Sequence, residues 1–312
     1  MNLKFSVVIV NWNSRDDLRA CLQGLQGQTE RDFETVVVDN GSHDDSVAMV
    51  RSEFPQAILI EAGENLGFAE GCNVGIAKAT GDWIVTLNND AEPALDWLAK
   101  LRKVIDDAGT ELGMVQSKIL FRDRPDHTNS TGVLIGRNGH FVDRGFDQPL
   151  RADEVIEDIF CASAGAAAYR RAMLDRICLR TGYFDRTFFM YFEDVDLGWR
   201  ARLSGWSAVY APESVVYHAF HGSAARRGKR FVTVHCARNR LRLLLKNASV
   251  SYIVRALPRL VSDFAASLFF ERTAALGEFY RAARDGWTQR ALVARIAQCK
   301  RDGVERQWVV RR

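Results

Sequence analysis

Strand and helix patterns alternate across the first hundred residues, and this alternation restricts the fold more than any other feature of the sequence. Apolar runs typical of buried strands occupy residues 5–10, 33–39, 57–62 and 83–87. Helical patterns follow them at residues 14–26, 43–54, 65–79 and 93–107, the last one opened by Pro93. Strands joined by helices pair in parallel through right-handed crossovers, so we expect an α/β sandwich around a mostly parallel sheet.

The rest of the chain is less regular. We expect strands at residues 113–121 and 131–136, a polar loop at 143–158, and a closing strand or hairpin at 207–219. Beyond residue 235 the apolar residues recur at helical spacing, and the basic stretch "RRGKR" precedes them. The pattern therefore predicts a main domain at residues 1–228 and a basic helical region at residues 229–312.

Charge is distributed unevenly along a chain whose composition, 47% hydrophobic and 26% charged, is that of a folded protein. Residues 221–312 contain 20 Lys and Arg against 6 Asp and Glu, a net charge of +14, whereas residues 1–220 contain 22 against 33, a net charge of −11. A basic tail on an acidic body indicates an anionic partner, such as a membrane surface or a nucleic acid. The alternative is a solvated basic face with a contact between two copies of the chain.

Cysteine usage and hydropathy indicate the cellular compartment. The six cysteines are scattered and form no C-x-x-C pair, which argues against a disulfide framework or a zinc cluster and is typical of the reducing cytoplasm. Runs without Asp, Glu, Lys or Arg, such as 159–169, are too short to span a bilayer. We therefore expect a cytoplasmic protein. Any contact with the cell membrane would be peripheral and at its inner face.

Oxygen-rich side chains end three of the four predicted strands. They stand at Asn11–Asn13, at Asp39–Ser42 and at Asn88–Asp90. Each group alone is also what an ordinary turn would use, because Asn and Asp tolerate tight backbone geometry. Ligands of open parallel sheets bind beyond the carboxyl ends of the strands, so the three groups together predict a binding site there.

The kind of ligand follows from what these loops lack. Neither a G-x-G-x-x-G turn nor a Walker G-x-x-x-x-G-K loop is present to hold phosphates on backbone N–H groups. A diphosphate would then need a cation, and Mg²⁺ is often bound through one or two carboxylates together with substrate phosphates, which favours Asp90. Asp39 could accept hydrogen bonds from a nucleobase or a ribose.

A second acidic group lies in the stretch "FFMYFEDVDLGWRARLSGW", residues 188–206. Glu193, Asp194 and Asp196 follow an aromatic run and open a helical pattern. They could simply favour the helix dipole. Burial beside the aromatic residues would instead raise the pKa of a carboxylate and suit it to act as a general base.

Six stretches carry a resemblance to a known family. They occur in the order "VVIVNWN", "VVVDNGSHDDS", "NLGFAEGCNVGI", "LNNDAEP", "GYFDRTFFMYFEDVDLGWRARLSGW" and "APESVVYH". The set resembles family 2 inverting glycosyltransferases of the GT-A fold, in particular the bacterial rhamnosyltransferases, over residues 4–225. The resemblance implies a GT-A sandwich with a nucleotide-sugar half at 1–110 and an acceptor half at 111–228.

The resemblance also implies roles for residues of the donor side. Asp39 matches the carboxylate that binds the base of the donor, with Asn11 and Asn13 nearby. Asn65 and Gly67 match the donor-binding loop.

The metal and the base are implied in the same way. Asn88 and Asp90 occupy the first and last places of the family's Asp-X-Asp, with Asn88 standing where Asp is usual. Asp90 and His218 would hold Mg²⁺ or Mn²⁺. Asp194 matches the base that deprotonates the acceptor, with Glu193 beside it, and Asp196 is expected to contact substrate.

The implied reaction is transfer of a sugar, by branch resemblance from dTDP-rhamnose, to a glycan or a lipid-linked saccharide acceptor. Two other functions remain open from the residues alone. A sugar nucleotidyltransferase could share the fold and the cation site, although no Gly-rich basic loop follows the first strand. A nucleic-acid binder could use the tail but leaves the acidic groups unexplained, so we expect no nucleic acid.

Overall fold

The computed structural model describes residues 4–220 and 223–310. Its first half follows the predicted alternation, with bounds β1 (Phe5–Asn11), α1 (Arg15–Gln26), β2 (Phe33–Asp39), α2 (Ser46–Glu53), β3 (Ile58–Glu61), α3 (Gly67–Lys78), β4 (Trp83–Leu87), β5 (Ala91–Pro93) and α4 (Trp97–Asp106). One boundary was wrong: Pro93 ends the short strand β5, and the helix begins at Trp97. Pro93 is instead the point where β5 pairs with Val216 of a later strand.

The second half begins with strands β6 (Leu112–Phe121), β7 (His127–Ser130), β8 (Val133–Gly136), β9 (Phe141–Asp143), β10 (Gln148–Pro149), β11 (Glu157–Asp158) and β12 (Ala166–Arg170). It continues with α5 (Arg171–Ile177), a 3₁₀ turn η1 (Arg186–Phe188), α6 (Glu193–Leu203) and β13 (Ser207–His218). The predicted loop at 143–158 thus contains two short strands. The closing element is one long strand rather than a hairpin, and it runs parallel to β6.

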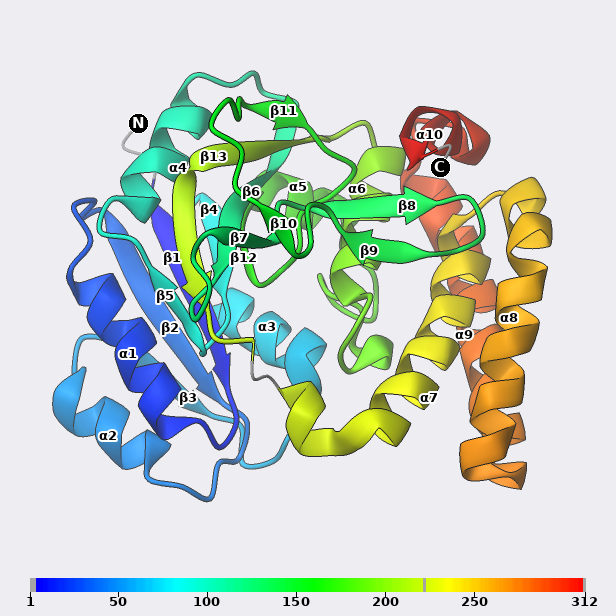
Figure 1. Cartoon of the computed structure of the whole chain (residues 1–312), viewed down its shortest axis with the longest axis horizontal. Helices are drawn as coiled ribbons and strands as arrows, with labels where there is room; N and C mark the ends of the chain where they lie inside the picture. The colour runs from blue at the N-terminus through cyan, green and yellow to red at the C-terminus, as the bar shows by residue number, and fades with distance from the viewer. Residues whose placement is uncertain (1–3, 221–222, 311–312) are drawn as a thin grey trace.

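The central sheet is largely parallel and has the strand order β10-β7-β6-β12-β4-β1-β2-β3. Strands β3, β2, β1 and β4 are parallel, and β12 inserts antiparallel between β4 and β6. The register sets Asn11 at the end of β1 beside Asp39 at the end of β2. The carboxyl ends of the first strands therefore meet at one edge (Figure 1).

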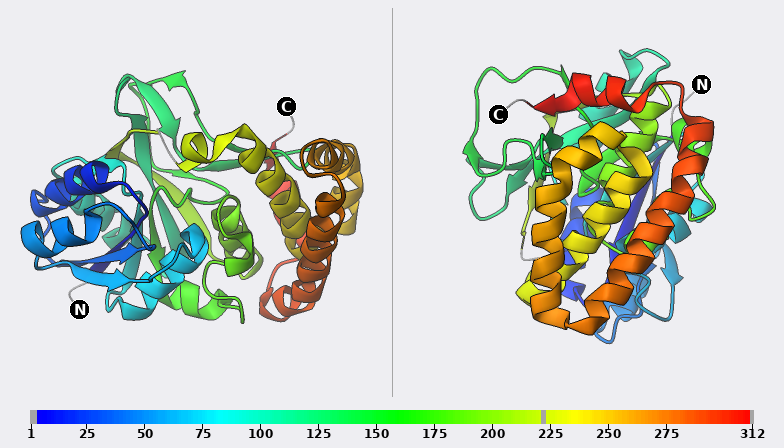
Figure 2. Two further views of the ribbon diagram at one scale, coloured as in Figure 1. Left: turned by 90° about the horizontal axis from the view of Figure 1, so that it is seen from below. Right: turned by 90° about the vertical axis from the view of Figure 1, so that its right-hand side faces the viewer.

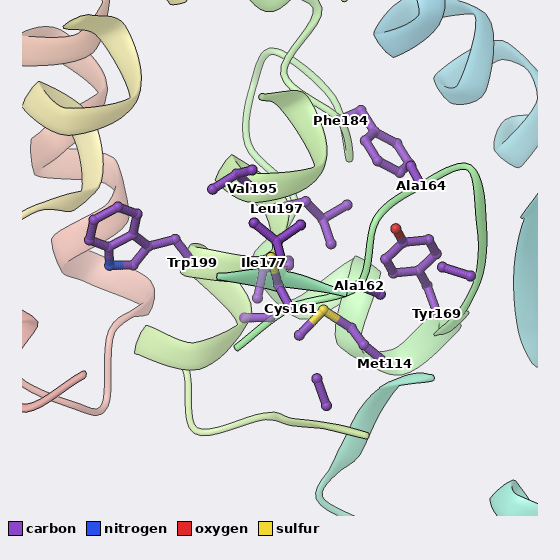
Figure 3. Packing of buried hydrophobic residues seen from close by; sticks show 14 of the residues in the cluster. Met114, Cys161, Ala162, Ala164, Tyr169, Ile177, Phe184, Val195, Leu197 and Trp199 are labelled. Atoms are coloured by element: carbon purple, nitrogen blue, oxygen red, sulfur yellow. The ribbon is translucent and has the colours of Figure 1, made fainter. Parts of the chain in front are cut away.

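Helices cover both faces of the sheet, and each face has its own hydrophobic core. Helices α1, α2 and α4 pack with β-strand residues such as Trp83 on one face. Helices α3, α5 and α6 pack on the other face around Tyr169 and Trp199, where Val195 and Leu197 of α6 join the cluster (Figure 3). Within α3, Gly71 and Gly75 allow this packing, because an added Cβ would lie 2.7 and 2.4 Å from valine side chains of β1.

The C-terminal region is helical, as predicted. It consists of α7 (Ser223–Asn247), α8 (Val250–Glu271), α9 (Thr273–Ile296), α10 (Arg301–Trp308) and the short strand β14 (Val309–Val310). Helices α7, α8 and α9 stand side by side (Figure 2). Among the described residues, no helix is both long and apolar enough to cross a membrane.

This region shares its core with the rest of the protein. Leu243, Leu244 and Tyr252 belong to the same buried cluster as Val8 and Trp199. Strand β14 pairs in parallel with β8 and so completes a second, three-stranded sheet with β9. The division at residue 228 stays a prediction, but the helices pack as part of the fold rather than as a separate tail.

Candidate active site

A cavity of about 600 Å³ opens beyond the carboxyl ends of β1, β2 and β4. It is also lined by residues from β9, from the loop before β12, from the start of α6 and from the end of β13. Asp90 and Asp194, which are far apart in the sequence, both line it. The volume lies in the range of pockets that bind small molecules.

Hydrogen bonds to one segment of backbone explain why these two acids line the same cavity. The segment 163–165 runs between them: the Gly165 carbonyl accepts from the Asn88 N–H at 2.9 Å, and the Ala164 N–H donates to Asp194 Oδ2 at 3.1 Å. The small residues of "CASAGAAAY" thus partly line the site and partly form the buried strand β12.

The Asn88–Asp90 turn is joined to His218 by strand pairing. Directly after the turn, β5 pairs antiparallel with the end of β13, which sets Ala91 opposite His218. His218 Nε2 lies 3.0 Å from Asp90 Oδ1 and 3.2 Å from Asn88 Nδ2. The structure therefore brings the three residues predicted for the metal and diphosphate end into contact.

Asp90 is 8% exposed, and two opposed effects set its pKa. Burial favours the neutral acid, but the hydrogen bond and the charge of His218, together with the charge of Arg122, lower the pKa below its ordinary value. Asp90 is therefore a carboxylate at neutral pH and can face a cation.

The metal-ligating side chains present here suit a divalent cation that also binds a substrate. Asp90 offers a carboxylate and His218 an imidazole, while His218 Nδ1 lies 3.0 Å from Asn129 Oδ1. A metal-ligating histidine usually has its second ring nitrogen hydrogen-bonded in this way. Within the described chain no three His, Cys, Asp or Glu side chains could hold a metal ion by themselves. The remaining ligands would have to come from a bound phosphate, water or the Asn88 amide.

Asp194 is half-buried in the cavity wall at the first turn of α6. Burial, and to a lesser extent the charge of Asp143, raise the pKa of Asp194 to about 6, although the Ala164 N–H favours the ionised form. A carboxylate with this pKa is still mostly ionised at pH 7 and is a stronger base than an exposed aspartate.

Glu193 also lines the cavity, but it differs from Asp194 in its surroundings. It is 6% exposed, and its Oε2 atom has no hydrogen-bond partner. Burial, reinforced by the charge of Asp194, raises the pKa of Glu193 well above its ordinary value. The surroundings of Glu193 therefore favour its neutral form.

The predicted donor loop also lines the cavity. Asn65 and Gly67 lie there, and the Gly67 N–H donates to Asn65 Oδ1 at 3.0 Å. Gly67 has φ +80° and begins α3, and a Cβ on it would lie 2.5 Å from the Phe189 carbonyl oxygen. Gly67 is thus needed where the donor loop touches the segment before α6. At Gly63, four residues earlier, an added Cβ would meet no atom within 4 Å in the described chain.

The expectation that Asp39 faces the same cavity as Asp90 and Asp194 was wrong. Asp39 is 3% exposed and does not line it, nor do Asn11 and Asn13. The Asp39 carboxylate accepts from Asn11 Nδ2 at 3.2 Å and from the Ser42 N–H at 2.9 Å. Asn11 Oδ1 in turn accepts from Asn89 Nδ2 at 2.8 Å. Asp39 and Asn11 therefore hold the lining residue Asn89 in place without lining the cavity themselves.

Asp196 also lies elsewhere than expected, because α6 turns it away from the cavity. Its carboxylate is fully buried and bonded to Arg200 at 2.9 Å, Lys246 at 2.9 Å and Asn247 at 2.8 Å. With every contact made to protein groups, Asp196 has no free oxygen to contact substrate.

Asn129 and Asp143 are polar lining residues to which the sequence analysis gave no role. Asp143 stands at the start of the stretch that was expected to be a polar loop. A polar residue inside a short strand such as β7 was the available signal for Asn129. Only the pairing of β8 with β9 brings Asp143 to the site.

Comparisons with known proteins identify the family. The family model "Glycosyl transferase family 2" matches residues 6–178. Uncharacterized glycosyltransferase YfnE of Bacillus subtilis is 27% identical over 264 residues, covering 71% of this chain and 66% of that protein. The N-acetylglucosaminyl-diphospho-decaprenol L-rhamnosyltransferase of Mycobacterium tuberculosis is 26% identical over 250 residues, covering 73% of this chain and 80% of the relative.

A solved structure supports the fold. The mannosyltransferase PcManGT of Pyrobaculum calidifontis, in complex with GDP-Man and Mn²⁺, matches with a TM-score of 0.56 and 18% identity, over 99% of this chain and 88% of that one. The α/β fold with its largely parallel sheet is thus that of GT-A glycosyltransferases. The chain belongs to glycosyltransferase family 2.

Proposed function

We propose that this protein is an inverting glycosyltransferase that moves a sugar from a nucleoside-diphosphate donor to an acceptor hydroxyl. The observation that carries the proposal is the shared cavity of Asp90 and Asp194, linked through Ala164 and Gly165. One carboxylate is placed to meet a cation and a diphosphate. The other has the pKa of a general base.

In the proposed mechanism Asp194 takes the proton of the acceptor hydroxyl. The acceptor oxygen then forms a bond to the anomeric carbon while the bond from that carbon to the diphosphate breaks, and the nucleoside diphosphate leaves with the electron pair. Attack from the face opposite the leaving group inverts the anomeric centre. Burial of Glu193 disfavours a second negative charge beside the base.

At the donor end, Asn88, Asp90 and His218 would hold Mg²⁺ or Mn²⁺. When bound, such an ion neutralises charge on the leaving diphosphate. Asn65 and Gly67 line the donor side, and Asp39 with Asn11 and Asn13 would shape the base-binding loops from behind.

We propose dTDP-rhamnose as the donor and a lipid-linked saccharide as the acceptor. The support is the 26% identity to the mycobacterial rhamnosyltransferase, whose name states a diphospho-decaprenol acceptor. A lipid-linked acceptor would require the protein to work at the membrane surface.

Helices α8 and α9 offer a face for that surface. Of the sixteen large apolar side chains exposed in the described chain, eight lie on these helices: Val250, Val254, Leu257, Val261, Phe269, Leu276, Tyr280 and Trp287. The most exposed charged residues of α8, of α9 and of the residue between them are all arginines, namely Arg255, Arg272, Arg281, Arg284 and Arg295. Two of them, Arg281 and Arg284, pair with the partly exposed Glu278 and Asp285. Exposed apolar residues among arginines match an anionic bilayer surface.

Vesicle flotation tests the membrane face. The protein should float with vesicles that contain anionic lipid, and Val261→Asp combined with Phe269→Asp should abolish flotation. Ile58→Asp, at an exposed apolar residue of β3, is the matched control and should float normally. Dimerisation in sedimentation without flotation would favour the contact between two copies.

A transfer assay tests the reaction. The protein should convert dTDP-rhamnose and a lipid-diphosphate saccharide into dTDP and an elongated saccharide whose new linkage is inverted, as read by the anomeric coupling in NMR. Asp194→Asn should lower kcat by about 10²-fold or more. Formation of a nucleotide sugar from a sugar phosphate would instead show a nucleotidyltransferase. A retained anomeric configuration would refute the single displacement.

A further inference from the structure

The backbone directly before α6, the helix that carries Asp194, is strained. Seven non-glycine residues of the described chain have positive φ, and three of them fall within four positions: Phe189 (φ 64°), Tyr191 (φ 67°) and Phe192 (φ 68°). Bulky aromatic residues are rare in this conformation, and such strain persists only where the surroundings enforce it. Phe192 immediately precedes α6, whose second residue is Asp194.

The strain begins with a tight turn centred on Phe189. This residue has φ 64° and ψ −62°, and the Met190 N–H donates to the Phe188 carbonyl at 2.7 Å. A three-residue γ-turn with positive φ is a rare and strained form. The 188–192 turn therefore needs partners from other elements.

Helix α7 supplies such partners, chiefly through the side chain of Asn239. Asn239 Nδ2 lies 2.9 Å from the Phe188 carbonyl, 2.9 Å from the Met190 carbonyl and 3.0 Å from the Tyr191 carbonyl. His235, one turn earlier on α7, has its Nε2 atom 3.2 Å from the same Phe188 carbonyl. A single buried amide thus contacts three carbonyls of the strained turn.

The orientation of the Asn239 amide is fixed from its other side. Arg242 Nη1 donates to Asn239 Oδ1 at 2.7 Å, so the amide oxygen faces a donor and the NH₂ group faces the carbonyls. The Arg242 guanidinium also lies over the Phe188 ring, 5.5 Å from its centre. Across the turn, the Ala69 N–H at the start of α3 donates to the Phe189 carbonyl at 3.1 Å. The 188–192 turn is therefore held between α3 and α7.

We propose that Asn239 is a positioning residue, whose amide holds the 188–192 turn in its strained form and thereby fixes where α6 presents Asp194 to the acceptor. This inference rests on the proposed role of Asp194 as the base. It assigns the C-terminal helical region a part in building the active site, in addition to any membrane contact. The amide itself touches no substrate.

The test compares two substitutions of Asn239 with a control on the same helix. Asn239→Ala removes the amide, and Asn239→Asp keeps its shape while replacing the NH₂ donor by an acceptor that faces three carbonyls. Asn247→Ala is the matched control, because Asn247 is also buried on α7 and its amide donates to Asp196 and to the Leu243 carbonyl, outside the cavity. Asp196 keeps Arg200 and Lys246 in that control.

Both Asn239 variants should lose about 10²-fold in kcat, the scale expected when a reacting group moves by about 1 Å, with little change in the KM for the nucleotide-sugar donor. Backbone amides of residues 188–194 should exchange hydrogen for deuterium faster than in the parent protein. Asn247→Ala should keep its kcat and its exchange in this segment, even where it lowers thermal stability.

Clear outcomes would overturn the inference. It is wrong if Asn239→Asp folds and keeps kcat within about threefold of the parent, or if Asn247→Ala loses as much kcat as Asn239→Ala. Should the Asn239 variants fail to fold, Arg242→Lys provides a milder change. It keeps the positive charge but weakens the hydrogen bond that orients the Asn239 amide. Full kcat with unchanged hydrogen exchange in Arg242→Lys would refute the positioning role of Asn239. Asp194→Asn is measured alongside: turnover retained in that variant refutes the base itself, whatever Asn239 does.

Discussion

Replacing Lys246 by methionine should destabilise the protein strongly, because the residue neutralises a fully buried acidic pair. Lys246 Nζ lies 2.6 Å from Asp185 Oδ2 and 2.9 Å from Asp196 Oδ2, and all three side chains are 0% exposed. Arg200, also fully buried, is the second cation and contacts Asp196. Methionine fills a similar space but leaves the buried Asp185 carboxylate without its ion pair, while Asp196 keeps Arg200.

The magnitude follows from removing one partner of a buried ion pair, which costs about 3–5 kcal/mol of unfolding free energy. At about 2 °C per kcal/mol for a chain of this size, the Tm should fall by roughly 6–10 °C. Combining Lys246→Met with Asp185→Asn restores a balance of one acid and one base, so the double variant should be more stable than the sum of the two single effects.

The stability that Asp185 contributes should depend on pH, and the shift of its pKa gives the direction. Burial opposes ionisation of Asp185, but Lys246 and Thr187 lower the pKa of Asp185 far below its ordinary value, so its contribution to stability is present at neutral pH. That contribution is lost as the pH falls through about 3.9, the pKa of an unfolded aspartate, and beyond it. The stability difference between the parent and Lys246→Met, measured by urea unfolding, should therefore shrink between about pH 5 and pH 3. A constant difference, or additive effects in the double variant, would refute the reasoning.

Three further results are expected. The kcat of the parent should fall as the pH decreases through about 6, because protonated Asp194 cannot accept the acceptor proton, and a flat profile down to about pH 4.5 would exclude Asp194 as the base. Asp90→Asn should raise the Mn²⁺ concentration needed for half-maximal transfer, and full activity in EDTA would show that no cation works at this residue. Gly67→Ala should lower both kcat and Tm more than Gly63→Ala does, because both glycines have positive φ but only Gly67 lies against Phe189, and equal effects would show that the contact is unimportant.

The sequence was sufficient for the fold of the first half because each strand and helix there carries its own periodic pattern. The elements from β1 to β4 follow from apolar runs and polar loops that are local in the chain. The pattern failed at Pro93, where pairing between β5 and β13 overrides the usual preference of proline for the first turn of a helix.

The site was partly predictable for a related reason. Asp90 and Asp194 could be placed because each ends or opens a recognisable element. Asp39 and Asp196 could not, because their surroundings depend on contacts between distant segments: Asn11 and Ser42 cover one carboxylate, and Lys246 and Arg200 surround the other. The net charge of the tail also exceeds the charge on its surface, since Arg240 and Lys246 form buried ion pairs.

The pairing of β14 with β8 has a consequence for how the protein comes into being on the ribosome. Synthesis must reach Val310 before β8 gains its parallel neighbour, and β8 is the strand that holds β9 with Asp143 against the cavity. Strands β1 to β4 are therefore complete early in synthesis, whereas the part of the cavity wall that contains Asp143 gains its last supporting strand only after every helix of the described chain has been made.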